Sequence, residues 1–221
     1  MRIFIFGDSI AQGFYDSHGG WAERIAAKYH RHAVKNRLAG MEGSAIMVYG
    51  LGASGDTADG VLNRIKPEVE ARQLWEDDDF IIIAIGINDA ILRKNTPAMD
   101  AYEFQGKLEK ILSEAQKLSD NIMFVGLTAV DESKTDPWAY STTGNQWKNS
   151  RINLFEDTIK QVAEYAEVPF IPIHDAFLAG LEQGHELLTD GLHPNDAGHK
   201  FIAAKVEPSI AQLINQYEAK L

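Results

Sequence analysis

The run Phe80–Ile85 constrains the fold of this chain more than any other stretch, because it is apolar throughout. A strand with one face in water alternates apolar and polar residues, so an unbroken apolar run is typical of a strand covered on both faces. Short apolar runs recur along the chain and predict further strands. These runs are Ile3–Phe6, Ser44–Leu51, Asn121–Leu127 and Val168–Ile173.

Helical periodicity fills the gaps between these runs. Pro67 should kink or end the helix that follows Thr57. Thr96 is predicted to cap the next helix, with Pro97 as its first residue. Strict alternation of strands and helices predicts an α/β fold with parallel strands, right-handed crossovers and helices on both faces. The one long irregular stretch is 131–149, and long loops inside compact domains are often functional.

Size and composition narrow the function. A chain of 221 residues is expected to form one domain, residues 1–221. The formal net charge of −11 argues against nucleic acid and anionic membranes as partners. The absence of cysteine excludes a disulfide, a thiolate zinc site and a cysteine nucleophile. No apolar run reaches the length of a membrane span, and no signal-peptide pattern precedes the first strand, so a cytoplasmic location is expected unless a signal was trimmed.

Polar or glycine-rich residues follow the predicted strands one after another. Ser9 follows the first strand, 52–57 the second, and Asn88 and Asp89 the third, while 131–149 follows the fourth. The carboxyl ends of parallel strands lie along one edge of a sheet, where ligands bind. These groups are therefore expected to converge on one crevice, although Asp8 and Ser9 could also simply form a turn or cap a helix.

Serine chemistry at such a crevice needs a base. A serine hydroxyl becomes a good nucleophile when a histidine, itself oriented by a carboxylate, takes its proton. Asp190 precedes His193 by three residues and can curl back onto the imidazole. The alternative interpretation of this block is a turn and a helix start capped by Asn195. His174 follows the fifth strand and could also reach the crevice, whereas His18, His185 and His199 are expected to be solvated surface residues.

Acyl transfer also needs hydrogen-bond donors for the developing oxyanion. The candidates are the amides of Ser9 and Gly52 and the side-chain amide of Asn88. Gly52 could equally be a strand-ending glycine, and Asn88 a turn residue. Three aromatic residues of the long loop could line an acyl or aryl pocket or pack over the sheet edge, and they are Trp138, Tyr140 and Trp147.

Four blocks together resemble the SGNH (GDSL-type) serine hydrolase family. They are Gly7-Asp8-Ser9-Ile10, Gly52-Ala53-Ser54-Gly55-Asp56-Thr57, Gly86-Ile87-Asn88-Asp89 and Asp190-Gly191-Leu192-His193-Pro194. They occur in the family's order, span nearly the whole chain, and each follows a predicted strand or precedes the last helix. One block alone is a weak signal, whereas all four in this order are a specific one.

The resemblance implies a flavodoxin-like, three-layer sandwich with a five-stranded parallel sheet. It also implies hydrolysis of a small-molecule ester or thioester, without metal or cofactor. By the same resemblance Ser9 is the nucleophile, His193 the general base and Asp190 its partner, and the oxyanion hole consists of Ser9, Gly52 and Asn88. Family members often carry asparagine where this chain has Gly50, which puts the support of the following loop in question.

Other functions fit the sequence less well. The glycine pattern at 50–55 matches a dinucleotide fingerprint, but the required acidic residue would fall at 75–78, before the third strand begins. The serine context lacks the final glycine of the α/β-hydrolase elbow. A metalloenzyme is disfavoured because His193 and His199 have no known ligand spacing. A catalytically inactive binding protein on a similar fold remains an alternative, and the acyl group, leaving group and oligomeric state stay open.

Overall fold

The protein is described by a computed structural model that covers residues 1–40, 45–73 and 78–220. A five-stranded parallel sheet has the order β2-β1-β3-β6-β8. Its strands are β1 (Arg2–Gly7), β2 (Met47–Gly52), β3 (Asp79–Ala84), β6 (Ile122–Val125) and β8 (Phe170–Ile171). In order along the chain these are strands one to five, so the sheet has the 2-1-3-4-5 order of flavodoxin-like folds. The predicted fold class is confirmed.

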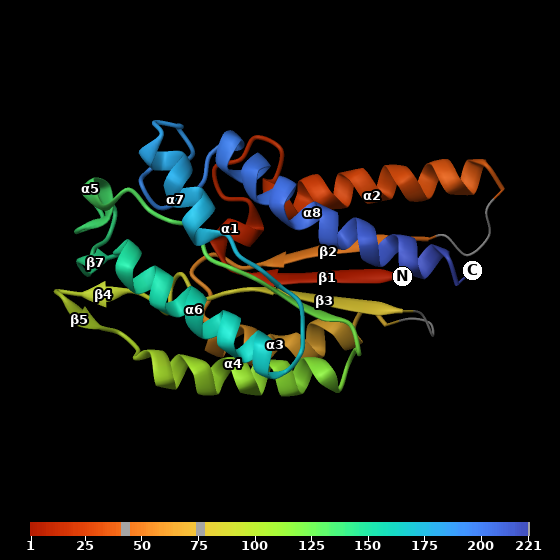
Figure 1. The fold of residues 1–221 in the computed structure, drawn as a ribbon, viewed down its shortest axis with the longest axis horizontal. Helices are drawn as coiled ribbons and strands as arrows, with labels where there is room; N and C mark the ends of the chain where they lie inside the picture. The colour runs from red at the N-terminus through yellow and green to blue at the C-terminus, as the bar shows by residue number, and fades with distance from the viewer. Residues whose placement is uncertain (41–44, 74–77, 221) are drawn as a thin grey trace.

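Helices cover both faces of the sheet (Figure 1). One face carries α2 (Gly20–Leu38) and α8 (Asp196–Glu218), and the other carries α3 (Ala58–Glu70), α4 (Ala101–Gln116) and α6 (Asn149–Tyr165). Three short helices lie near one end of the molecule, and they are α1 (Ser9–Gln12), α5 (Glu132–Thr135) and α7 (His174–Glu182). Among the helices of the described ranges, none has the length and apolarity that a membrane crossing requires.

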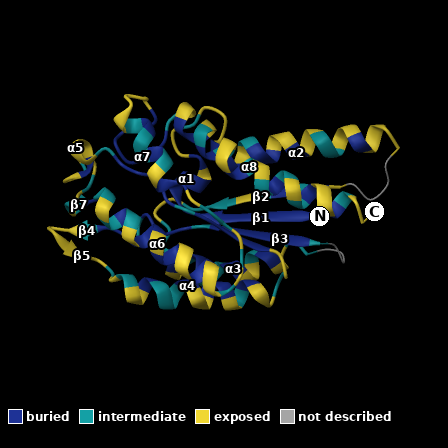
Figure 2. Cartoon of the chain, in the orientation of Figure 1, coloured by how far each residue is buried: buried dark blue, intermediate teal, exposed yellow. Residues whose placement is uncertain are grey.

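The core lies between the sheet and these two helical layers. Every residue of β1 and β6 is buried, and so is every residue of β3 except Ala84. Figure 2 shows β1 and β3 in the colour of buried residues. Continuous apolar strands are what a sheet covered on both faces requires. The Phe80–Ile85 run therefore occupies the position that its pattern predicts, and it pairs with β1 on one side and β6 on the other.

The five predicted strands all occur in the main sheet, with shifted ends. The second strand begins at Met47, and Ser44, where it was expected to begin, lies outside the described residues. Positions 75–77, which bear on the dinucleotide alternative, also lie outside them. The fifth strand shortens from the expected 168–173 to Phe170–Ile171, because it pairs with β6 at only two residues at the edge of the sheet.

One expectation about helices is wrong. Thr96 and Pro97 do not start a helix but form β5 (Thr96–Pro97), which pairs antiparallel with β4 (Leu92–Arg93). The helix begins at Ala101, because the Asp100 side chain accepts a hydrogen bond from the amide of Glu103 and caps it.

Pro67 neither ends α3 nor marks its boundary, since the helix continues to Glu70. Proline removes the hydrogen bond to the carbonyl four residues earlier. That carbonyl belongs to Asn63, and both Asn63 and Pro67 are exposed, so water can replace the missing donor.

The stretch 131–149 is less irregular than expected. It contains α5 and a short strand β7 (Asn145–Gln146), which pairs antiparallel with β4. The strands β5, β4 and β7 form a small second sheet beside the carboxyl edge of the main sheet. Pairing to β4 thus anchors the loop, and a contact between β4 and residues more than fifty positions away leaves no local pattern in the sequence.

Candidate active site

Ser9 lies where β1 ends and the chain turns into the short helix α1. Asp8 caps α1, since its carboxylate accepts a hydrogen bond of 2.9 Å from the amide of Ile10. Ser9 is the first residue of the helix and is buried. The turn interpretation of Asp8 is thus correct, and the cap also fixes the serine at the carboxyl edge of the most buried strand.

Ser9 and Asp190 meet on opposite sides of one imidazole. Ser9 Oγ lies 3.1 Å from His193 Nε2, and Asp190 Oδ2 lies 2.8 Å from His193 Nδ1. A carboxylate accepts hydrogen bonds, so Nδ1 carries the proton that Asp190 receives and Nε2 is left to accept the proton of the serine hydroxyl. The structure therefore joins Ser9 to His193, 184 positions away in sequence, and through it to Asp190 in a single series of hydrogen bonds.

The block 190–193 is a tight turn that presents the imidazole. Asp190 Oδ1 accepts hydrogen bonds from the amides of Leu192 and His193, at 3.0 and 2.8 Å. Gly191 has a φ of +91°, which glycine adopts without strain. Burial alone would raise the pKa of Asp190, but the hydrogen bonds from the side chain and amide of His193 and from the amide of Leu192 hold it below its usual value. Asp190 is thus an anion that orients His193.

The helix start at Asn195 is also present. Its side chain accepts hydrogen bonds from the amides of Ala197 and Gly198 and caps α8. The two interpretations of this block were therefore not exclusive, because the same turn caps the last helix and carries the imidazole.

Gly52 lies opposite Gly7 in the pairing of β2 with β1. A Cβ at position 52 would lie 2.1 Å from the amide nitrogen of Gln12, so only glycine allows the backbone of β2 to approach α1 this closely. Family members often carry asparagine at the position of Gly50. In this protein, other hydrogen bonds support the loop that follows. The carbonyl of Gly7 accepts hydrogen bonds from the amide of Ala53 at 3.0 Å and from Arg64 Nη2 at 2.9 Å.

Asn88 joins the loops that follow β2 and β3. Its Nδ2 donates a hydrogen bond of 2.9 Å to the carbonyl of Asp56. An amide nitrogen carries two hydrogens, so this bond orients the group and leaves a second donor. The neighbouring Asp89 is buried, and both its carboxylate oxygens lie 3.1 Å from the amide of Ala58 at the start of α3. The two residues together lock the geometry of the sheet edge.

Aromatic rings surround the imidazole. The ring of Trp138 lies 5.8 Å from that of His193, between centroids, and it also contacts Tyr140 and Trp147. Trp147 is buried and donates a hydrogen bond of 2.8 Å to the carbonyl of Ile87, so it is a packing residue. Tyr140 is 69% exposed and contacts Trp138 but has no described contact with His193.

Two further rings were missed by the sequence reasoning. Phe14 and Tyr15 lie 5.3 and 5.6 Å from the ring of His193. Their closeness to Ser9 along the chain was the available signal, because residues just after a short helix at the sheet edge stay near that edge.

The remaining histidines lie elsewhere. His174 begins α7, and its Nδ1 lies 3.2 Å from Asp175 Oδ1 on that same helix. His18 and His185 are exposed, as expected. The expectation for His199 is wrong, because it is fully buried. Its Nδ1 accepts a hydrogen bond from the amide of Trp21, and its Nε2 donates one to the carbonyl of Phe14, so both ring nitrogens are satisfied without water.

One group of potential metal ligands comes together among the described residues, Asp16, His18 and Asp196. Arg24 already binds both carboxylate oxygens of Asp16, and Ser17 binds both those of Asp196. The oxygens of both carboxylates are thus already engaged by donors of the protein itself.

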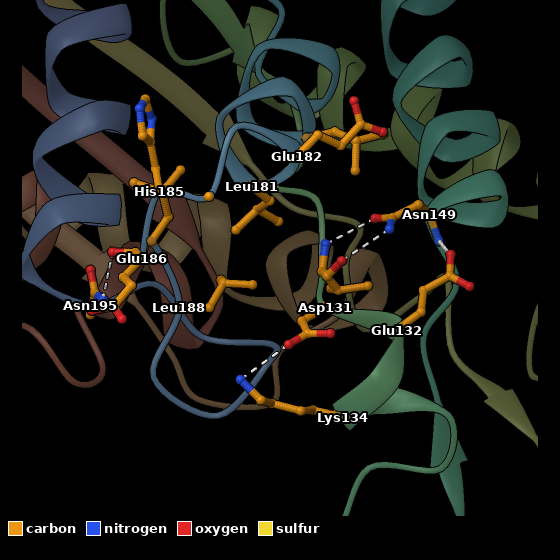
Figure 3. Close-up of a pocket in the computed structure, with 14 residues that line it drawn as sticks. Asp131, Glu132, Lys134, Asn149, Leu181, Glu182, His185, Glu186, Leu188 and Asn195 are labelled. Carbon is orange, nitrogen blue, oxygen red and sulfur yellow. Dashed lines mark hydrogen bonds and ion pairs between the residues drawn. The ribbon is translucent and has the colours of Figure 1, made fainter.

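A separate hollow of about 630 Å³ lies between α5, α6 and α7. Figure 3 shows Leu181 and Leu188 pointing into it above the ion pair of Asp131 with Lys134, which are 3.1 Å apart. Its lining does not include Ser9 or His193. The Asp131 amide donates a hydrogen bond of 2.8 Å to the carbonyl of Gly191, so the hollow is bounded by the residues that support the turn.

The sheet order and the two helical layers define an α/β protein of the flavodoxin-like class. Within that class, residues 5–201 match the GDSL-like lipase/acylhydrolase family, and the chain belongs to that family of hydrolytic enzymes. The resemblance drawn from the four sequence blocks is thereby confirmed.

Individual relatives have low sequence identity to this chain. The isoamyl acetate-hydrolyzing esterase of Saccharomyces cerevisiae is 23% identical over 224 residues, which cover 99% of this chain and 90% of that protein. A lipolytic G-D-S-L family protein of Veillonella parvula superposes with a TM-score of 0.71 at 19% identity, covering 96% of this chain and 98% of that one. Axe2, an acetylxylan esterase of Geobacillus stearothermophilus, gives a TM-score of 0.70 at 20% identity, covering 95% and 93%. At these identities the two structures support the fold.

Proposed function

We propose that the chain, as a single catalytic domain, is a serine esterase that hydrolyses carboxylic esters through an acyl-enzyme on Ser9. The observation that carries the proposal is the hydrogen-bonded chain from Ser9 Oγ to His193 Nε2, 3.1 Å, and from His193 Nδ1 to Asp190 Oδ2, 2.8 Å. In this series of hydrogen bonds His193 is the general base, and Asp190 orients its imidazole. Nucleophile, base and orienting carboxylate within hydrogen-bond reach are the arrangement that serine acyl transfer requires.

The chemistry follows from the protonation states. Ser9 Oγ bonds to the ester carbonyl carbon as its proton passes to His193 Nε2. The bond from that carbon to the alcohol oxygen then breaks, and the alcohol leaves with the proton from Nε2. A water molecule, deprotonated by the same nitrogen, hydrolyses the acyl-enzyme and restores Ser9. Asp190 stabilises the imidazolium that forms in both steps, and its lowered pKa keeps it ionised.

The carbonyl oxygen becomes negative in both steps. The amides of Ser9 and Gly52 and the side chain of Asn88 are the proposed donors to this oxyanion. The close approach of β2 to α1 at Gly52 and the oriented Nδ2 of Asn88 support this assignment. Donors fixed before the reaction stabilise the transition state without a reorganisation cost.

The proposed substrate is a small neutral ester, with acetyl as the acyl group to test first. Isoamyl acetate and acetylxylan, the substrates in the names of two relatives, share an acetyl group. Thioesters and sugar O-acetyl groups are chemically within reach of the same site. A panel of 4-nitrophenyl esters, acetylated sugars and acyl thioesters measures the preference.

The test of this function is the nucleophile. We expect Ser9→Ala to keep the thermal melting curve of the wild type, to lose labelling by a fluorophosphonate probe and to lose ester hydrolysis by at least ~10³ in kcat/KM. Undiminished hydrolysis by a folded Ser9→Ala variant would refute the mechanism. An inactive wild type that binds esters without labelling would favour the binding-protein alternative.

Alanine variants of His193 and His174 together test which histidine is the general base. We expect His193→Ala to be nearly inactive, because the proton of Ser9 then has no acceptor. We expect His174→Ala to keep activity, because that ring lies on α7 with Asp175 as its described partner. The reverse outcome would make His174 the base and the pair of Asp190 with His193 structural.

A further inference from the structure

Three aromatic rings form a collar around the imidazole of His193. The collar consists of Phe14, Tyr15 and Trp138, whose centroids lie 5.3, 5.6 and 5.8 Å from that of His193. Phe14 and Tyr15 also contact each other at 4.5 Å. Two of these rings remain exposed, Phe14 at 43% and Tyr15 at 50%. A ring that served only to pack the core would be buried, so half-exposed rings beside a reactive imidazole leave apolar surface for a ligand.

Phe14, the first residue of the collar, is held in place by hydrogen bonds to both its backbone amide and its carbonyl. The amide of Phe14 donates a hydrogen bond of 3.0 Å to the carbonyl of Ser9. The carbonyl of Phe14 accepts one of 3.1 Å from Nε2 of the buried His199 on α8. Burial lowers the pKa of His199, which keeps the ring neutral and this donor in place. The segment is therefore anchored and does not hang loosely over the site.

The backbone conformation of Tyr15 also indicates that this segment is fixed by its surroundings. Its φ is +66°, in the left-handed region that residues other than glycine, asparagine and aspartate seldom adopt. A bulky side chain in this conformation is a sign that the surrounding structure fixes the backbone, and such residues cluster at ligand sites. The backbone turn at Tyr15 places its ring edge-on to the imidazole, at 74° between the ring planes.

The path of the proton from His193 indicates which half of an ester lies against the collar. His193 Nε2 must give its proton to the oxygen of the departing alcohol, so that oxygen lies within hydrogen-bond reach of the imidazole. The carbonyl oxygen lies instead towards the donors Gly52 and Asn88. Rings packed around the imidazole therefore surround the alcohol half of the ester. The acyl half extends from the carbonyl carbon and is not bound to the imidazole.

We propose that Phe14, Tyr15 and Trp138 form the binding site for the leaving alcohol and select esters of apolar alcohols. This proposal rests on the proposed function, because it uses His193 as the group that protonates the alcohol. Three rings around one position favour alkyl or aryl alcohols, which bury apolar surface against them. Selectivity therefore resides in the alcohol and is weak for the acyl chain.

The first experiment compares two ester series. One series keeps the acetyl group and enlarges the alcohol, from ethyl to butyl to benzyl acetate. The other keeps ethanol and enlarges the acid, from acetate to butanoate to hexanoate. For the wild type we expect kcat/KM to rise about tenfold from ethyl to butyl acetate, the effect of burying two methylenes. We expect a change of about twofold or less along the acid series.

Tyr15→Asn is the decisive variant, because asparagine tolerates the left-handed backbone and removes the ring. We expect it to reduce the butyl-to-ethyl ratio of kcat/KM from about tenfold to about twofold. Tyr15→Phe should restore the ratio, since it keeps the ring. Tyr165→Ala removes a tyrosine that is 94% exposed at the end of α6 and should leave the ratio unchanged.

A second readout isolates the alcohol site from all acyl effects. Every acetate forms the same acetyl-enzyme, which either water or an added alcohol can attack. By microscopic reversibility, 1-butanol binds where the leaving alcohol departed. We expect Tyr15→Asn to lower the ratio of butyl acetate formed to acetate released about fivefold.

The two proposals fail in different ways. The proposed function is refuted if Ser9→Ala retains activity or if the wild type is not labelled by the fluorophosphonate probe. Labelling and dependence on Ser9, with a flat alcohol series or a Tyr15→Asn variant that keeps the butanol partition, overturn the alcohol site and leave the esterase mechanism standing. Selectivity that follows the acid series has the same consequence.

Discussion

Asn88 is the residue at which two roles meet. Its Nδ2 donates to the carbonyl of Asp56, which ties two loops together, and the same nitrogen is the proposed donor to the oxyanion. Loss of the loop tie alone should cost about 1 kcal/mol of stability and little rate. Loss of an oxyanion donor should lower kcat by ~10²–10³ with little change in KM. Steady-state kinetics of Asn88→Ala on one good ester, beside thermal melts, separates these effects.

Asn88→Asp sharpens that test because the two side chains have nearly the same shape. The carboxylate would face both the oxyanion and the carbonyl of Asp56, which now accepts a hydrogen bond from the amide. We therefore expect Asn88→Asp to be slower than Asn88→Ala. A folded Asn88→Ala enzyme with kcat within a few-fold of the wild type would leave Ser9 and Gly52 as the proposed donors.

Local and distant contacts explain which residues the sequence could predict. Asp190 and His193 were predictable as a pair, because three residues are enough to close the turn. The structure brings Ser9 to them, as expected from the common edge of the strands. Arg64 and His199 were not predictable as supports of that edge. Arg64 reaches Gly7 across 57 positions and His199 reaches Phe14 across 185, and such contacts leave no periodic signal.

At the scale of elements, the stretch 131–149 brings an aromatic ring to the imidazole. Trp138 is half-buried, and its ring contacts those of Trp147 and His193. We expect Trp138→Ala to shift the preference for the chain length of the alcohol about tenfold, while kcat/KM for ethyl acetate falls about threefold or less. The shorter ester does not reach the ring, whereas a longer one loses its contact.

Tyr140→Ala is the matched control for this loop. Tyr140 is exposed and touches Trp138, so its removal should change the chain-length profile by about twofold or less. Kinetics on the same esters compares the two variants. An unchanged profile in Trp138→Ala would make that residue part of the packing.

Elements were predictable where local pattern decided their ends. The five strands follow from apolar runs, and the start of α8 follows from Asn195. The misplaced start of α4 shows the limit of this reasoning. Thr96-Pro97 has the composition of a helix start, but pairing with β4 holds these residues extended, and Asp100 supplies the cap instead. The pairing belongs to a local hairpin closed by Lys94 and Asn95, both with positive φ, and this hairpin overrides the preference of Thr96-Pro97 for a helix start.

At the scale of the whole molecule, the fold was predictable because alternating strands and helices allow few topologies. What the alternation does not reveal is the set of carboxyl groups enclosed in the structure. Burial raises the pKa of Asp8 to about 7, of Asp89 to about 6 and of Glu156 to about 7, against hydrogen bonds that favour the ionised forms. Asp8 and Asp89 lie in the loops that follow β1 and β3, and Glu156 accepts hydrogen bonds from the amides of Leu127 and His174, which follow β6 and β8. Ionisation of these buried carboxyl groups at the edge of the sheet therefore lowers the free energy of unfolding.

The sign of that effect fixes a pH dependence. A carboxyl group with a raised pKa in the folded state favours folding while it is protonated. Its contribution is complete below the unfolded pKa, 3.8 for Asp89, and is lost as the pH rises through the folded value of about 6. The contribution of these three groups to the free energy of unfolding should therefore fall between about pH 4 and pH 7. Asp190, with its lowered pKa, contributes in the opposite sense and loses its contribution at acid pH.

Asp89→Asn isolates one of these groups. Asparagine keeps an oxygen to accept the hydrogen bond from the amide of Ala58 and does not titrate. We expect the variant to match the wild type in stability near pH 4 and to exceed it by up to about 3 kcal/mol at pH 8, which is the free energy between pKa values of 3.8 and about 6. Urea unfolding at a series of pH values measures the difference, with the exposed Asp120→Asn as control. Curves for Asp89→Asn and the wild type that stay parallel across this range would mean that Asp89 is ionised in the folded protein at no cost.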